Sequence, residues 1–251
     1  MLQHRIIPSL LLKEGRLVKG VGFSEHRDAG NPATTVRAYS AQKADEILLL
    51  DIEANRRGDG PDLSAVRAVA AECSIPLSVG GGITSTDIAK SCLDNGADKI
   101  CLNTAALDRP ELITECARQF GSQAVVVAID VTFREGKPAI FDNRTGTYAP
   151  AVDWLDWMEE AAFRGAGEFR LMDVDREGRR TGYNSDLLMK ARSRTNLPVI
   201  VEGGAGDLKD LTAAMDNGCE ALALGTMLVF SDNNIIQVKR FLKNAGFPIR
   251  L

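Results

Sequence analysis

Four aspartates stand where apolar runs of this 251-residue chain end, and that position suggests acid–base chemistry. In a fold of parallel strands the carboxyl ends of the strands face the substrate, so a carboxylate there can transfer protons. Asp130 is the leading candidate, because it follows the apolar run VVVAI. A loop or helix cap is the alternative. For Asp51 a cap and an acid–base role are equally plausible, and for Asp173 and Asp175 a cap is favoured.

The rest of the composition restricts acid–base work to carboxylates or lysines. The chain has two histidines, His4 and His26, and five cysteines without C-x-x-C spacing. These residues predict neither a histidine-based triad, nor a zinc site, nor a disulfide framework. We therefore expect no metal and no cofactor. Unpaired cysteines are typical of the reducing cytoplasm, which we predict as the location.

Charge and hydropathy argue against two classes of partner. The net charge is −4 without a basic run, whereas nucleic-acid phosphates need clustered positive charge. The longest apolar runs, residues 47–50 and 124–129, fall far short of the roughly 20 residues that span a bilayer. We predict no nucleic-acid partner and no membrane insertion. The N-terminal sequence MLQHRIIPSLLL shows no leader with a cleavage site.

Two glycine-rich segments, VGGGI at residues 79–83 and VEGGAG at 201–206, follow apolar runs. Glycines lack a Cβ and so let backbone N–H groups converge on an anion. In each case the next apolar run leads to a threonine, Thr104 or Thr226, whose hydroxyl would complete a phosphate cradle. Tight turns explain a single glycine pair better. The doubled pattern favours two phosphate sites and an elongated ligand with phosphate at both ends.

Charged residues open several apolar runs at their other ends. A side chain at the start of a barrel strand points toward the N-terminal mouth of the barrel. Singly, each of these charges is an ordinary solvated residue. Together they predict a ring across the bottom of a barrel that acts as a gate. The four residues are Arg5, Glu46, Lys99 and Glu168.

Apolar runs alternate with amphipathic stretches along the whole chain, which is a βα pattern. The runs are continuous, as in parallel strands buried on both faces. Helical patterns lie between them, for example from Pro61, as a helix start, and from Thr84 to Gly96. We predict a single (β/α)8 TIM barrel, with a doubly wound open sheet as the alternative. The expected strands are residues 5–10, 47–51, 76–79, 99–102, 125–130, 168–172, 198–201 and 221–224.

An internal repeat favours the closed barrel. The segment from Ile75 aligns without gaps to the segment from Leu197, an offset of 122 residues that also places Asp51 over Asp173. Each half then supplies four βα units, and two such halves close an eightfold barrel. We predict one domain, residues 1–251, built from homologous half-barrels at roughly 1–122 and 123–251.

Two further patterns predict structural elements. Residues 131–141, VTFREGKPAIF, predict a β-hairpin that turns at Glu135-Gly136 and forms a lid or rim over the site. Trp154 and Trp157 follow helical spacing and are interpreted as packing or interface residues.

Segments along the whole chain resemble the cyclase subunit of imidazole glycerol phosphate synthase in histidine biosynthesis. They include RIIPSLLLKEGRLVKGVGF, DEILLLDIEA, IPLSVGGGITS, KICLNTAAL, FGSQAVVVAIDV, DREGRRTGY, LPVIVEGGAG and the ending FPIRL. The resemblance implies a (β/α)8 barrel that docks a glutaminase subunit on its N-terminal face as a heterodimer. Ammonia then passes through the barrel to a two-phosphate ribonucleotide, which is cyclised and cleaved.

The resemblance also implies roles for single residues. Asp130 is implied as catalytic with support from Lys19 and Asp51, and Asp98 as a residue of the docking face. The gate of the family corresponds to Arg5, Glu46, Lys99 and Glu168. The phosphate ligands correspond to Gly82, Asn103 and Thr104 in the first half and to Gly178, Gly204, Gly225 and Thr226 in the second.

Two departures from the family pattern concern the chemistry. One of the two essential acid–base aspartates of the family is replaced by Leu11, which cannot transfer a proton. Glu202 places a negative charge beside the second phosphate cradle and requires a cation to offset it. The cluster Arg176, Arg179 and Arg180 is a candidate for that cation.

The segment LLL at residues 10–12 and the sequence from Ala29 resemble a divergent branch of the family. That branch accompanies a glutaminase homologue and a separate amidotransferase in surface-polysaccharide gene sets. We therefore predict a barrel that conducts glutamine-derived ammonia toward acetamidino modification of a sugar, with a phosphorylated ligand and a downstream amidotransferase as further partners. Two alternatives stay open. They are a working histidine-pathway synthase in which Glu14 or Glu53 replaces the missing aspartate, and a scaffold that only activates the glutaminase.

Overall fold

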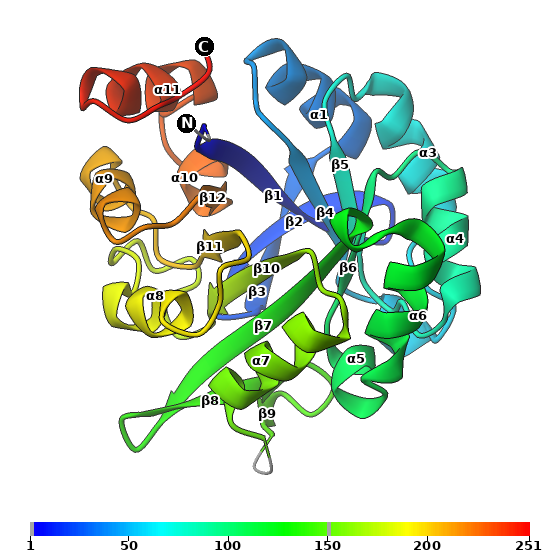
Figure 1. Ribbon diagram of the computed structural model, residues 1–251. Helices are drawn as coiled ribbons and strands as arrows, with labels where there is room; N and C mark the ends of the chain where they lie inside the picture. Colours follow the sequence, from blue (N-terminus) through cyan, green and yellow to red (C-terminus); the bar gives the residue numbers. More distant parts are fainter. Residues whose placement is uncertain (1–2, 150–151) are drawn as a thin grey trace.

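The computed structural model describes residues 3–149 and 152–251. Within these ranges eight parallel strands close into a barrel (Figure 1). In order of pairing they are β1 (Arg5–Lys13), β4 (Ile47–Asp51), β5 (Leu77–Gly80), β6 (Lys99–Leu102), β7 (Val125–Arg134), β10 (Glu168–Asp173), β11 (Val199–Glu202) and β12 (Ala221–Leu224), which pairs with β1 again. The predicted (β/α)8 barrel is confirmed, and the open sheet is excluded. Its origin from two half-barrels stays a prediction.

Helices surround the barrel. The longer ones are α1 (Pro32–Ala41), α3 (Leu63–Glu72), α4 (Thr86–Asp94), α6 (Glu111–Phe120), α7 (Trp154–Arg164), α8 (Ser185–Arg192), α9 (Leu208–Asp216) and α11 (Ile235–Asn244). Short helices follow β4, β6 and β12: α2 (Ala54–Arg57), α5 (Thr104–Asp108) and α10 (Thr226–Val229). None of the helices in the described ranges has the length and apolar character needed to cross a bilayer.

Local sequence explains where the helices begin. Asp62 accepts hydrogen bonds from the backbone N–H groups of Ser64 and Ala65, which makes it the N-cap of α3. The prediction of Pro61 as the helix start is therefore wrong, because the aspartate after it provides the better cap. In α7 the predicted helical packing is confirmed, since Trp154 and Trp157 are buried.

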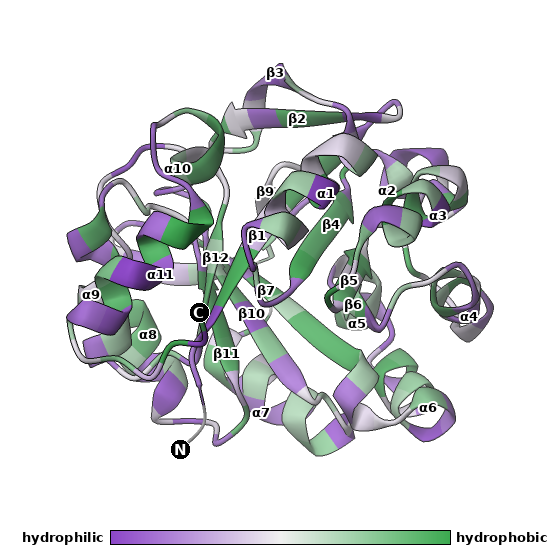
Figure 2. Cartoon of the chain, turned by 90° about the horizontal axis from the view of Figure 1, so that it is seen from above, coloured by the Kyte–Doolittle hydropathy of each residue, from purple (hydrophilic) through white to green (hydrophobic). Residues whose placement is uncertain are grey.

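Alternate side chains of each strand point into the barrel, as the pleat of a strand requires. Ile7 of β1 packs inside with Leu48 and Val126. Its neighbour Ile6 belongs to the larger core that the strands form with the helices. Figure 2 shows the strands as a mostly hydrophobic centre within a ring of helices. On β1 the odd-numbered residues, including Leu11, therefore face the interior.

Two hairpins extend beyond the barrel. The predicted one is confirmed: β7 pairs antiparallel with β8 (Lys137–Asp142), which continues into β9 (Thr147–Tyr148). Glu135 and Gly136 both have positive φ, as its tight turn requires. The other hairpin, β2 (Arg16–Val21) with β3 (Ser24–Gly30), is not predicted, because β3 is polar and largely exposed. β1 continues past the predicted end to pair with β2.

Two phenylalanines, one buried and one exposed, allow a test of which residues belong to the core. Phe169 of β10 is fully buried, whereas Phe163 of α7 is 89% exposed. We expect Phe169→Ala to lower the free energy of unfolding by about 3–5 kcal/mol, because it leaves a cavity in a packed core. The control Phe163→Ala should change it by less than about 0.5 kcal/mol. Urea unfolding measures both, and equal effects would contradict this assignment of the core.

Candidate active site at the carboxyl ends of the strands

A cavity of about 590 Å³ opens at the carboxyl ends of the strands. Its lining brings together predicted residues from the first half of the chain and from β7. These are Asp51, Gly82, Asn103, Thr104 and Asp130. Gly204, Gly225, Thr226 and Lys19 are not among the described residues that line it. The two halves thus contribute unequally to the cavity.

Asp130 lies at the floor of this cavity and is held on both carboxylate oxygens. The amide nitrogens of Asn103 and Asn143 donate to Oδ2 at 2.8 and 2.7 Å. Arg170 donates to Oδ1 at 3.0 Å. The carboxylate is therefore oriented by three donors. Three of its roughly four lone-pair positions are occupied, and one position on Oδ1 is left for a ligand.

Arg170 lies in the candidate site and was not predicted from the sequence. Its guanidinium is buried inside the barrel and donates through Nε to Glu202 at 2.6 Å. Burial alone raises the pKa of Glu202, but the charges of Arg170 and Lys19 outweigh it and hold that pKa below its ordinary value. The signal in the sequence is the spacing from Glu168, because residues two apart on a strand face the same side.

The cation that offsets Glu202 is therefore Arg170 and not the predicted cluster of three arginines. Arg176 instead donates to the carbonyl oxygen of Gly182 at 3.0 Å, and Arg180 to that of Gly206 at 3.3 Å. These arginines hold the loops that follow β10 and β11.

The carboxylate of Asp51 binds the loop that follows β4. Its oxygens accept hydrogen bonds from the backbone N–H groups of Glu53 and Asp62 at 3.1 and 2.9 Å, and from Arg57 at 2.7 Å. Asp173, its counterpart in the repeat, accepts from the backbone of Arg176. These contacts are those of a loop cap. A supporting role for Asp51 in catalysis stays a prediction.

The four charged strand starts meet at the opposite end of the barrel. Arg5 binds Glu46 at 2.9 Å and also pairs with Glu168. Lys99 binds the same two glutamates, each at 2.9 Å. The result is a closed ring of alternating charge across the N-terminal mouth. Its function as a gate stays a prediction.

Asp98 lies on the same N-terminal side and is exposed. One of its oxygens accepts a hydrogen bond from the backbone N–H of Leu77 at 2.8 Å. This contact fixes the start of β5 and leaves the other oxygen for a partner. The docking role of Asp98 stays a prediction.

Comparisons with known proteins agree with this architecture. A family described as histidine biosynthesis protein matches residues 5–234. The chain belongs to this family. Over their full lengths, this chain and the imidazole glycerol phosphate synthase subunit HisF of Dictyoglomus thermophilum are 41% identical. The HisF subunit of Hyphomonas neptunium is 40% identical, and that of Caulobacter vibrioides 42%, over the whole of this chain and 99% and 97% of theirs.

At the rim of the cavity the chain presents Leu11, which points inward from β1. Of the two carboxylates considered as replacements, Glu53 lines the cavity and lies 3.5 Å from Lys13. Glu14 stands exposed in the turn between β1 and β2. Only Glu53 is therefore placed to reach a ligand, and its charge is already paired.

The buried network predicts how stability depends on pH. Arg170→Met leaves Asp130 and Glu202 without their cation, so we expect a loss of about 3–5 kcal/mol in the free energy of unfolding. In the native chain the lowered pKa of Glu202 gives stability that is present at neutral pH and lost on acidification. In Arg170→Met the pH dependence of stability is reversed, because burial without the arginine raises the pKa of the Glu202 carboxylate.

Urea unfolding of Arg170→Met at about pH 5 and about pH 8 measures this reversal. The destabilisation should be larger at the higher pH. Adding Glu202→Gln, which removes one unpaired charge, should restore part of the lost stability. Equal losses at both pH values would show that the guanidinium contributes packing rather than charge.

Proposed function

We propose that this chain is a HisF-like synthase subunit that receives ammonia at the charged ring and passes it to the cavity at the other end of the barrel. The closed ring of Arg5, Glu46, Lys99 and Glu168 is the observation that carries the proposal. Beyond the ring the interior is lined by small and apolar side chains. Such a path admits neutral ammonia and excludes the ammonium ion, whose transfer from water is costly.

The source of this ammonia in our proposal is a glutaminase subunit, bound as a heterodimer on the face that carries Asp98. The relatives are named as subunits of a synthase, which supports a partner. A cytoplasmic location accompanies this proposal, and it is supported by the five cysteines, all of which are free thiols.

The ammonia acceptor we favour is a phosphorylated ligand outside histidine biosynthesis, in a pathway that amidates or amidinates a sugar for a surface polysaccharide. Leu11 and Arg170 favour it. A proton-transferring side chain is absent at the position of Leu11, and Arg170 holds the remaining carboxylate, Asp130. A downstream amidotransferase would then complete the reaction.

A second candidate is the cyclase reaction of histidine biosynthesis on a two-phosphate ribonucleotide. Its support is the full-length similarity to HisF subunits at about 40% identity, and this comparison favours the second candidate over the first. Asp130 and Glu53 would then share the acid–base work. A third possibility, a scaffold without ammonia transfer, lacks an explanation for the ring.

Cyclase assays of Leu11→Asp separate the first two candidates. General acid–base groups contribute roughly 10²–10⁴-fold to a rate. We expect the variant to gain less than about tenfold with the glutaminase and the two-phosphate ribonucleotide, because Arg170 still holds Asp130. The matched control is Leu11→Asn, which adds a polar group but no acid. A native rate typical of HisF subunits, or a gain of about a hundredfold in Leu11→Asp alone, would favour the second candidate.

Labelled nitrogen tests ammonia transfer itself. With amide-labelled glutamine in competition with unlabelled ammonium, the nitrogen in the product should come mainly from glutamine. Lys99→Met opens the ring and should lower that fraction at least about twofold, because ammonia then exchanges with solvent. The control Lys90→Met alters an exposed ion pair on α4 and should have no effect. Equal use of both nitrogen sources by the native complex would favour the scaffold.

A further inference from the structure

The two phosphate cradles predicted from the repeat differ in their access to the cavity. Gly82, Asn103 and Thr104 line the cavity of about 590 Å³. Their counterparts in the second half of the chain, Gly204, Gly225 and Thr226, line neither this cavity nor a smaller one of about 330 Å³ beside β1. The sequence repeat is therefore not matched by a repeat in the lining of these two cavities.

An ion pair occupies the position where the second cradle would open. Lys19 reaches from β2 so that its Nζ lies 3.0 Å from the place where a Cβ on Gly225 would stand. The same ammonium pairs with the carboxylate of Glu177, and both residues are buried. The backbone N–H of Gly22, at the tip of the β2–β3 hairpin, donates to the carbonyl oxygen of Glu177 at 3.1 Å. The hairpin thus packs onto the loop that follows β10.

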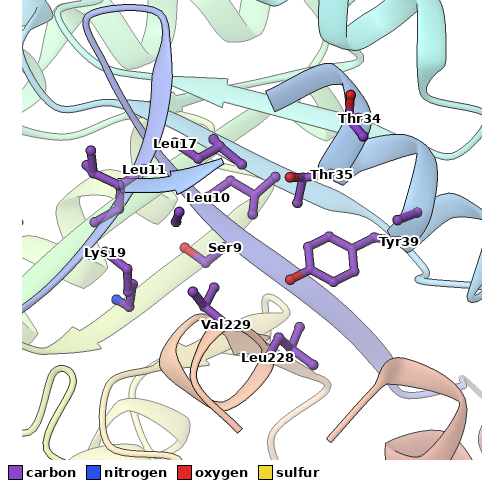
Figure 3. Close-up of a pocket in the computed structure, with 13 residues that line it drawn as sticks. Ser9, Leu10, Leu11, Leu17, Lys19, Thr34, Thr35, Tyr39, Leu228 and Val229 are labelled. Atoms are coloured by element: carbon purple, nitrogen blue, oxygen red, sulfur yellow. The ribbon is translucent and has the colours of Figure 1, made fainter. Parts of the chain in front are cut away.

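The same pair separates the two cavities. Leu11 lines both of them, whereas Lys19 lines only the smaller and Glu177 only the larger. Figure 3 shows Lys19 and Ser9 around the smaller cavity, with Val229 of α10 below them. A ligand in the larger cavity therefore meets Leu11 and Glu177 before it can approach α10.

Charge also bears on the second cradle. The larger cavity is lined by charges of both signs, since Lys13 and Arg56 pair with Glu53 and Arg144 pairs with Asp108 and Asp142. At the second cradle the charge of Lys19 is already compensated by Glu177, and Glu202 adds a further carboxylate nearby. A phosphate there would have to displace Glu177 from its cation.

We propose that the ligand of this barrel carries a phosphate at one end only, bound by the first half, and that the Lys19–Glu177 pair closes the second cradle. This inference rests on the proposed phosphorylated ligand and narrows its class. The other end of the ligand meets Phe23, Phe141 and Asn143, which line the same cavity and suit an uncharged polar group.

Inorganic phosphate, titrated into the full-length chain, tests the proposal by the backbone amide NMR shifts of both cradles. The amides of Gly82 and Thr104 should shift and saturate, whereas those of Gly204 and Thr226 should not respond. Thr104→Val should weaken the binding about tenfold, since it removes a hydrogen bond to a charged group. The matched variant Thr226→Val should leave the affinity unchanged. Glu177→Gln should make the second set of amides respond, because it frees the charge of Lys19.

The outcomes separate this inference from the proposed function. Saturable shifts at both cradles of the native chain would overturn the single-phosphate inference and leave the phosphorylated ligand standing. An absence of shifts at both cradles would overturn the phosphorylated ligand as well. If Glu177→Gln folds and the amides of Gly204 and Thr226 still do not shift with phosphate, the ion pair is not what closes the second cradle.

Discussion

The guanidinium of Arg170 lies inside the barrel between the carboxylates of Asp130 and Glu202. A buried charge is tolerated only when it is paired and hydrogen-bonded, so these three side chains depend on one another. Asn103 and Asn143 complete the shell around Asp130. The orientation of this carboxylate depends on Arg170 and the two asparagines, and the lowered pKa of Glu202 depends on Arg170 and Lys19.

The barrel interior is layered, because inward-facing residues of alternate strands lie at matching heights. A ring of four charges closes the N-terminal mouth, an apolar layer follows, and the Arg170 network lies toward the carboxyl ends. Charges at both ends need water or counter-charges, whereas the middle layer excludes ions. This order suits the passage of a small neutral molecule better than the passage of a charged one, and it is the physical basis for proposing ammonia.

Some side-chain contacts follow the 122-residue sequence repeat and others do not. Asp51 and Asp173 still cap equivalent loops. In contrast, the Lys19–Glu177 pair and Arg170 are placed without counterparts in the repeat, and Leu11 places an apolar side chain at the rim. The equivalent contacts therefore cap loops, whereas the contacts without equivalents lie beside the two cavities. The similarity to HisF subunits therefore says more about the fold than about the side chains at the cavities.

The sequence by itself determined the barrel, its strands and the ring of strand-start charges. Apolar runs, glycine turns and the 122-residue repeat report local geometry, and parallel strands necessarily bring their starts to one mouth. Only the tertiary structure decided that Arg170 binds Asp130, that Asp51 caps a loop, and that the polar hairpin β2–β3 packs onto the loop that follows β10. These outcomes depend on side chains from distant segments competing for the same few donors and acceptors, which no local pattern records.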